Sequence, residues 1–284
     1  MKGILAVALA FFAFAAAGEE AITATAKGRS YVLVAAMGDR LMATHEVRRT
    51  GSNLPPYRRT GLEAPDNVLN RLVLAGLDEA IGSMEPTSTR SHLAIALRRP
   101  RTDSAPMDAV ALETVVAELR ARPERAGWDR IVVATPAYRS LNVDGMSARS
   151  QGFGVFMQPL CQSMQGPCGM QTDGTSTSAA ETVQTPAGET IKANQFVAPY
   201  VFLKIWILDP RTLEVIESQE IFEYQKLWDP KADTMDLSEV IPKRVLATQI
   251  VKLAGQATEE AVKRTELRGR VEVKDKGEVK EPGK

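Results

Sequence analysis

Residues 200–224, YVFLKIWILDPRTLEVIESQEIFEY, carry the strongest β-hairpin pattern in this chain. Both arms, Tyr200–Leu208 and Leu213–Tyr224, are rich in the β-branched and aromatic residues that strands prefer. The Asp-Pro-Arg-Thr sequence between them predicts a turn, because proline presets the backbone angle that a turn needs. We therefore expect an antiparallel strand pair here, as part of a larger sheet.

Helices alternate with strands in the preceding half of the chain. Apolar residues recur at helical spacing from Asp66 to about Met84 and from Ser104 to about Arg122. The runs His92–Leu97 and Arg130–Ala134 predict strands, and an amphipathic helix is expected over about Ser238–Thr265. This order predicts an α/β (α+β) fold: a single mixed β-sheet with helices packed on it and a C-terminal amphipathic helix.

Two further segments complete the organisation of the N-terminal part. Ser30–Met37 and Arg40–Val47 are strand-like and flank Gly38-Asp39, a pair typical of a tight hairpin. The proline-containing stretch Gly51–Pro65 predicts a loop.

Residues 139–198 are rich in Gly, Ser, Thr and Gln and predict a long irregular insertion. The strand-like Gly152–Leu160 interrupts it, and its Gly-Phe-Gly start indicates either a glycine-rich strand edge or a close approach of two backbones. We expect one domain over 18–265 and a disordered charged tail over 266–284.

The composition excludes several classes of protein. The 284 residues include 35 basic and 35 acidic side chains, a balance that gives no support for nucleic-acid binding. Hydrophobic residues make up 44% and charged residues 25%, which is ordinary for globular proteins and excludes collagen-like and wholly disordered chains.

Residues 1–17 have the pattern of a cleaved signal peptide. Lys2 is followed by the apolar run Ile4–Phe14 and by Ala15–Ala17, a small-residue cleavage site before Gly18. The apolar run is shorter than the roughly 20 residues that a membrane-spanning helix needs. The sequence therefore predicts a periplasmic or secreted protein without a transmembrane anchor.

Export determines how the only two cysteines are interpreted. Cys161 and Cys168 flank a Gly-Pro turn signal, and in an oxidising compartment we expect them to form a disulfide bond. The alternatives are two inert thiols, or redox or metal chemistry, which the spacing does not favour.

The run from the helix over 104–122 through Trp128–Ala134 (WDRIVVA) to the hairpin around Asp209-Pro210 resembles two groups of envelope proteins. These are the N-terminal α/β domains of periplasmic TolB proteins and the penicillin-binding-protein activators. The whole chain resembles uncharacterised exported proteobacterial proteins. The resemblance implies binding of protein partners without chemistry. No propeller repeats follow and no lipid-acceptor cysteine precedes, so no functional residue is carried over.

A catalytic alternative depends on Asp39 and the two histidines, His45 and His92. Together they could ligate a metal for hydrolysis, whereas the simpler interpretation is a turn aspartate and strand histidines. Gly38–Leu41 superficially resembles the nucleophile block of Gly-Asp-Ser-Leu esterases, but Arg40 stands where the serine would attack.

A second alternative is an anion-binding module. Arg48, Arg49, Arg58 and Arg59 offer planar guanidinium groups for carboxylate or phosphate, provided that they converge on one surface. The other interpretation is a solvated face.

We favour an exported, non-catalytic module that needs no cofactor and binds an envelope protein. The partner and the oligomeric state are left open by the sequence. The expected binding surface is the segment 139–198. Its large apolar residues should form an ordered cluster beside the disulfide that exposes methionine and phenylalanine: Phe153, Val155, Phe156, Met157, Leu160, Met164 and Met170.

Overall fold

The computed structural model describes residues 28–46, 57–64, 67–97, 107–143, 146–157, 181–193, 196–228, 241–265 and 267. Several predictions lie outside these residues: the signal peptide, the Cys161–Cys168 disulfide, Arg48 and Arg49, and the tail beyond residue 267.

The predicted mixed α/β class and the C-terminal helix are confirmed. The helices are α1 (Val68–Met84), α2 (Met107–Arg120), α4 (Lys243–Arg264) and the short 3-10 helix η1 (Pro123–Gly127). The strands are β1 (Ser30–Ala35), β2 (Arg40–Glu46), β3 (Tyr57–Glu63), β4 (Thr89–Ala94), β5 (Arg130–Pro136), β6 (Tyr138–Val143), β7 (Met146–Met157), β8 (Glu181–Gln184), β9 (Thr190–Ala193), β10 (Val197–Leu208) and β11 (Val215–Tyr224).

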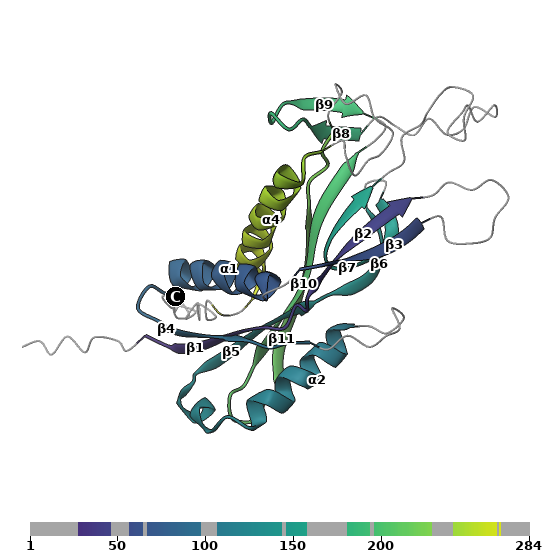
Figure 1. Cartoon of the computed structure of the whole chain (residues 1–284). Helices are drawn as coiled ribbons and strands as arrows, with labels where there is room; N and C mark the ends of the chain where they lie inside the picture. The colour runs from purple at the N-terminus through teal and green to yellow at the C-terminus, as the bar shows by residue number, and fades with distance from the viewer. Residues whose placement is uncertain are drawn as a thin grey trace, which may run out of the picture.

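Strand β10 lies in the middle of a nine-stranded sheet and pairs with three other strands (Figure 1). Its predicted hairpin partner β11 follows one edge through antiparallel pairing from Tyr200↔Tyr224 to Leu208↔Val215. The other edge is shared, because β7 pairs with Val197–Phe202 and β5 pairs with Leu203–Leu208. The sheet therefore divides into two arms, one ordered β7-β2-β3 and the other β5-β1-β4.

The predicted hairpin at Gly38-Asp39 is wrong. β1 pairs in parallel with β4 and β5, whereas β2 pairs with β3 and β7, so the chain passes from one arm into the other. Gly38 has a φ of 79°, which gives the bend between the two strands. The local signal identified the bend, but β1 is apolar on both faces and is buried between two parallel strands.

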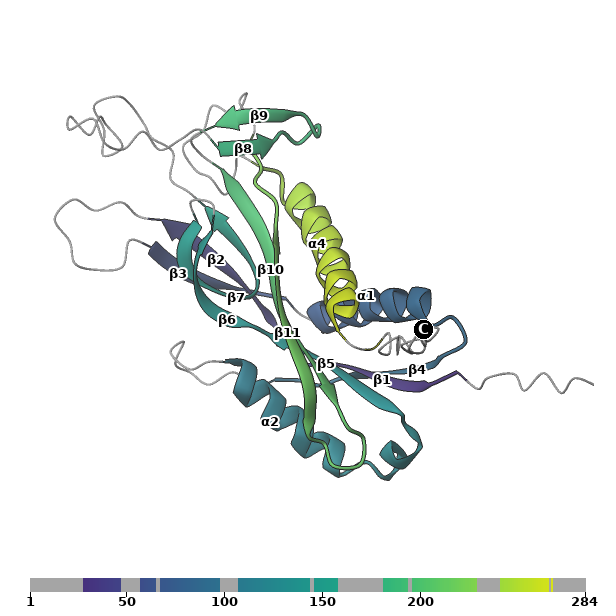
Figure 2. The ribbon, with the colours of Figure 1, turned by 180° about the vertical axis from the view of Figure 1, so that it is seen from behind.

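The two faces of the sheet are covered by different helices (Figure 2). Tyr31, Leu33 and Ala35 of β1 belong to the core under α1 and α4, and Val32 and Val34 belong to the core under α2. This alternation explains why β1 is apolar at every buried position.

Two segments predicted to be irregular contain strands. β3 lies within the predicted 51–65 loop, and β7, β8 and β9 lie within 139–198, as does all of β6 except Tyr138. Of these strands, only the part of β7 from Gly152 onward was predicted to be strand-like. Phe153, Phe156 and Met157 of β7 are only 1%, 2% and 5% exposed, so the expected exposed cluster is wrong for these residues. The segment is glycine-rich, yet it pairs with both β2 and β10. Phe153 and Met157 belong to the core under α1 and α4, and Phe156 belongs to a separate core cluster with Phe196 and Phe202.

Gly154 shows why the glycines of β7 are needed. A Cβ atom here would overlap the Tyr200 hydroxyl and the Met42 carbonyl oxygen. The absence of a side chain lets the Tyr200 ring lie against the β7 backbone. The Met42 carbonyl is the close backbone approach that was one of the two interpretations of Gly-Phe-Gly; the other, a strand edge, is wrong at Gly154, which pairs with both β2 and β10.

Candidate functional site

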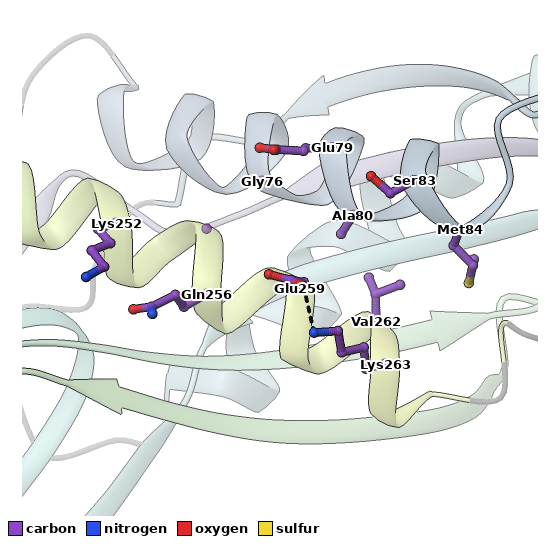
Figure 3. A pocket seen from close by; sticks show the side chains of 11 residues that line it. Gly76, Glu79, Ala80, Ser83, Met84, Lys252, Gln256, Glu259, Val262 and Lys263 are labelled. Carbon is purple, nitrogen blue, oxygen red and sulfur yellow. Dashed lines mark ion pairs between the residues drawn. The ribbon is translucent and has the colours of Figure 1, made fainter.

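A groove of about 430 Å³ lies between α1 and α4 (Figure 3). Helix α1 contributes Glu79 and Ser83 to one wall, and α4 contributes Lys252 and Gln256 to the other. Apolar side chains lie between the walls, and Glu259 forms an ion pair of 2.6 Å with Lys263 at one end. The remaining lining residues are Gly76, Ala80, Met84, Gly255 and Val262.

The two helices meet closely at Gly76. A Cβ atom on this residue would overlap the Thr258 hydroxyl. That hydroxyl is satisfied within its own helix, because it donates to the Ala254 or Gly255 carbonyl at 2.9 Å. Gly76 therefore permits the close contact that holds α1 against α4 beside the groove.

Gly255 lies in α4 and lines the groove, but for a different reason. No atom lies within 4 Å of the position that its Cβ would occupy, so packing inside the chain does not require a glycine. The backbone of α4 is left accessible in the groove at this point. The glycines at 76 and 255 are the sequence signal that could have located the groove, since both interrupt otherwise regular helical patterns.

A second hollow lies where β1 and β5 begin and is lined by Gly28, Arg29, Ser30, Gly127, Asp129 and Arg130. Within it, the Ser30 amide donates to Asp129 Oδ2 at 2.8 Å. Beside the hollow, Glu85 accepts from the Arg29 amide at 2.9 Å and from the Tyr31 hydroxyl at 2.8 Å.

These contacts shift the pKa values of Tyr31 and Glu85 in opposite directions. Burial, with the hydrogen bond to Glu85 as a further cause, raises the pKa of Tyr31 to about 12. Desolvation by itself raises the pKa of Glu85, but the hydrogen bonds from Arg29 and Tyr31 outweigh it and hold this pKa below its usual value. The Arg29 guanidinium also donates to the Leu267 carbonyl at 3.0 Å, so the cluster joins β1, α1 and the end of the described chain.

The three candidate hydrolase residues do not share a site. His92 of β4 pairs with Leu33 of β1. His45 follows Leu33 by twelve residues and lies in β2, in the other arm of the sheet. At about 3.3 Å per residue of an extended strand, His45 lies roughly 20 Å from Asp39, and it is in a different arm of the sheet from His92. Metal–ligand bonds are about 2 Å long, so one ion cannot contact these groups together.

His92 instead contacts Asp78 of α1, at 2.9 Å. Arg90 also donates to Asp78, at 3.0 Å. Desolvation opposes ionisation of Asp78, but these two hydrogen bonds prevail and lower its pKa. The cluster ties α1 to the edge strand β4.

Of the four arginines proposed to bind an anion, the structure describes Arg58 and Arg59. Arg58 and Arg59 are neighbours on β3, and successive side chains of a strand point to opposite faces. These two guanidinium groups therefore do not form one patch.

A buried polar residue that sequence reasoning missed is Asn70 of α1, which is 0% exposed. Its Oδ1 accepts from the Met37 amide at 2.7 Å, and its Nδ2 donates to the Ile95 carbonyl at 3.3 Å. Open α/β sheets often bind ligands beyond the carboxyl ends of parallel strands. Here that position, beyond β1 and β4, is filled by Met37 and Asn70. An asparagine within the apolar stripe of a predicted helix was the available signal.

Within the described ranges, no group of three or more His, Cys, Asp and Glu side chains is placed to hold a metal ion. None of the helices described is both long and apolar enough to span a membrane.

Comparison with known proteins found no matching family model and no curated protein similar in sequence. The similar solved structures include a DUF330 protein from Xanthomonas campestris, with 11% identity, a TM-score of 0.33 and 83% of each chain covered. A neuraminyllactose-binding hemagglutinin homolog from Helicobacter pylori has 8% identity and a TM-score of 0.38, covering 85% of this chain and 87% of that chain. Lipoprotein GNA1162 from Neisseria meningitidis has 11% identity and a TM-score of 0.24, covering 80% and 96% respectively.

These structures come from proteobacteria, and envelope-associated proteins are among them. TM-scores this low carry no argument about function. The resemblance to TolB domains and penicillin-binding-protein activators is not shown by these comparisons and stays a prediction.

Proposed function

We propose that this protein is an exported, non-catalytic module of the cell envelope that binds a protein partner through the α1–α4 groove. The observation that carries the proposal is Gly255. A glycine inside a helix is destabilising by about 1 kcal/mol relative to alanine. Because no neighbouring atom requires this glycine, the partly exposed backbone of α4 at Gly255 is available for close approach by another chain.

The groove fits an amphipathic helix of a partner. From Lys252 to Lys263 it follows α4 for about 16 Å, or three helical turns. Ala80 and Val262 provide an apolar floor, and Glu79 and Lys252 provide walls of opposite charge. The expected occupant carries a small residue over Gly255, an apolar stripe, acidic groups toward Lys252 and basic groups toward Glu79.

Export is the second part of the proposal and depends on residues 1–17. Their charged start, apolar run and small-residue cleavage site are the pattern of a secretory signal. A partner in the periplasm or at the membrane surface follows from this pattern.

Site-specific photocross-linking tests the groove. A photoreactive side chain at Ser83, which lines the groove, should capture one envelope protein in living cells, whereas the same group at exposed Thr212 should not. Gly255→Arg fills the groove and should abolish the Ser83 cross-link. Gly127→Arg is the matched control, because its Cβ also meets no atom within 4 Å but lies outside the groove.

The cross-linked product should form only when the α1–α4 groove is open. A product that forms equally from Thr212, or that persists in Gly255→Arg, would overturn the assignment. Loss of the product in Gly127→Arg with retention in Gly255→Arg would move the binding surface to the hollow beside β1 and β5.

A further inference from the structure

Strand β3 ends one arm of the sheet, and β2 is its only partner among the described strands. Figure 1 shows it at the margin of this arm. The Ala64 amide donates to the Asp39 carbonyl at 2.6 Å, in the same antiparallel register that pairs Arg40 with Glu63. Hydrogen-bonded and non-hydrogen-bonded pairs alternate along such a ladder. The outer edge is therefore formed by the N–H and C=O groups of Arg59, Gly61 and Glu63.

The side chains at these three positions also share one face of the sheet, because they alternate with those of Arg58, Thr60 and Leu62. Along β3, this face thus carries a positive charge, a glycine and a negative charge in order, and Arg40 of β2 lies opposite Glu63 on the same face. Antiparallel pairing of two copies around Gly61 places Arg59 of each copy opposite Glu63 of the other. The same register pairs the outward N–H and C=O groups of one copy with those of the other. The ion pairs and the backbone hydrogen bonds therefore require the same alignment of the two strands.

Two other edge strands, β4 and β11, do not have this property. The formally charged side chain of β4 is Arg90, and those of β11 are the acidic residues Glu217, Glu220 and Glu223. Self-pairing of either strand would place like charges near one another, which is destabilising.

An exposed apolar side chain lies on the opposite face of β3. Leu62 is 50% exposed, which is unusual for a large apolar side chain on this molecule. In the register around Gly61, Leu62 lies opposite Thr60 of the second copy, so pairing would remove part of it from water.

We propose that two copies of this chain associate through β3, in an antiparallel arrangement centred on Gly61. The contact would join two sheets with about six backbone hydrogen bonds. It uses the strand edge and leaves the α1–α4 groove open, so it is independent of the proposed partner site.

Cysteine cross-linking of the full mature chain tests the register, with linked peptides identified by mass spectrometry. Cα atoms of a hydrogen-bonded antiparallel pair lie about 5.5 Å apart, within disulfide range. Gly61→Cys should therefore form a covalent dimer, and the nearest atom to its new Cβ is the flexible Arg40 side chain at 3.3 Å. Thr60→Cys is the matched control and should not link, because its symmetry mate is diagonal. Preferential linking through Thr60→Cys would overturn the register.

Charge exchange tests the association itself, measured by sedimentation of the full chain up to roughly 100 µM. Arg59→Glu and Glu63→Arg should each weaken dimerisation about tenfold, because each places like charges opposite one another twice. The double exchange restores both pairs and should recover affinity to within about threefold. A monomeric wild-type protein, or no recovery in the double variant, would overturn the proposal. Gly255→Arg should leave dimerisation unchanged, which separates this result from the partner groove.

Discussion

Replacing Asn70 by alanine tests the polar connection between α1 and the ends of β1 and β4. The substitution leaves the Met37 amide and the Ile95 carbonyl without the partners that they have at 2.7 and 3.3 Å. Met37 and Ile95 are 2% and 6% exposed, so water does not easily replace these partners. Each orphaned buried group costs about 1–3 kcal/mol, and we expect a total loss of about 3 kcal/mol.

Urea unfolding followed by circular dichroism measures this loss. Asn70→Ala should lower the midpoint with little change in the slope, and the melting temperature should fall by about 6–12 °C. Ser83→Ala, at an exposed position of the same helix, is the control and should change stability by no more than about 0.5 kcal/mol. A loss below about 1 kcal/mol for Asn70→Ala would refute the argument that these backbone groups depend on Asn70.

Asn70→Asp gives a second, pH-dependent test. The new carboxyl group can still accept from the Met37 amide, but once ionised it could not donate to the Ile95 carbonyl. Burial should raise the folded-state pKa of this carboxyl above its unfolded value of about 3.9. The variant should therefore resemble the wild type most closely below about pH 4 and lose stability as the pH rises toward the folded pKa. Equal destabilisation at all pH values would contradict a donor role for the amide.

Gly154→Ala should lower the free energy of unfolding by about 1–3 kcal/mol, because the new Cβ overlaps Tyr200. Gly255→Ala should instead raise it by about 0.5–1 kcal/mol in the same urea assay. A loss of stability at both positions would refute the distinction between these glycines. Tyr31 should contribute stability that is fully present below about pH 10 and lost as the pH rises toward its folded pKa of about 12. Alkaline unfolding curves of Tyr31→Phe should lack this part of the pH dependence, and an unchanged slope would count against the raised pKa. Intact-mass analysis of the exported protein should give a chain that begins at Gly18 and has the mass of a closed disulfide; a chain that retains Met1 would remove the basis for export.

The sequence alone determined those elements whose pattern is local. Apolar spacing located α1, α2 and α4 to within a few residues, since one stripe of each helix faces the sheet. The β10–β11 hairpin followed from aromatic arms around Asp209-Pro210. There the Asp209 side chain accepts from the amides of Arg211 and Thr212 at 2.7 and 3.0 Å.

The tertiary structure alone decided which strands pair and which residues gather. Gly38 marks a bend in either arrangement, but only burial of β1 on both faces directs it between β4 and β5 instead of back onto β2. The glycines of β7 indicated a close approach by another part of the chain, but only the tertiary structure shows that Gly154 is required by the Tyr200 ring from a strand far along the sequence. Local preference reports backbone conformation, whereas strand order and the α1–α4 groove arise from contacts between distant segments, whose free energy no short window of sequence contains.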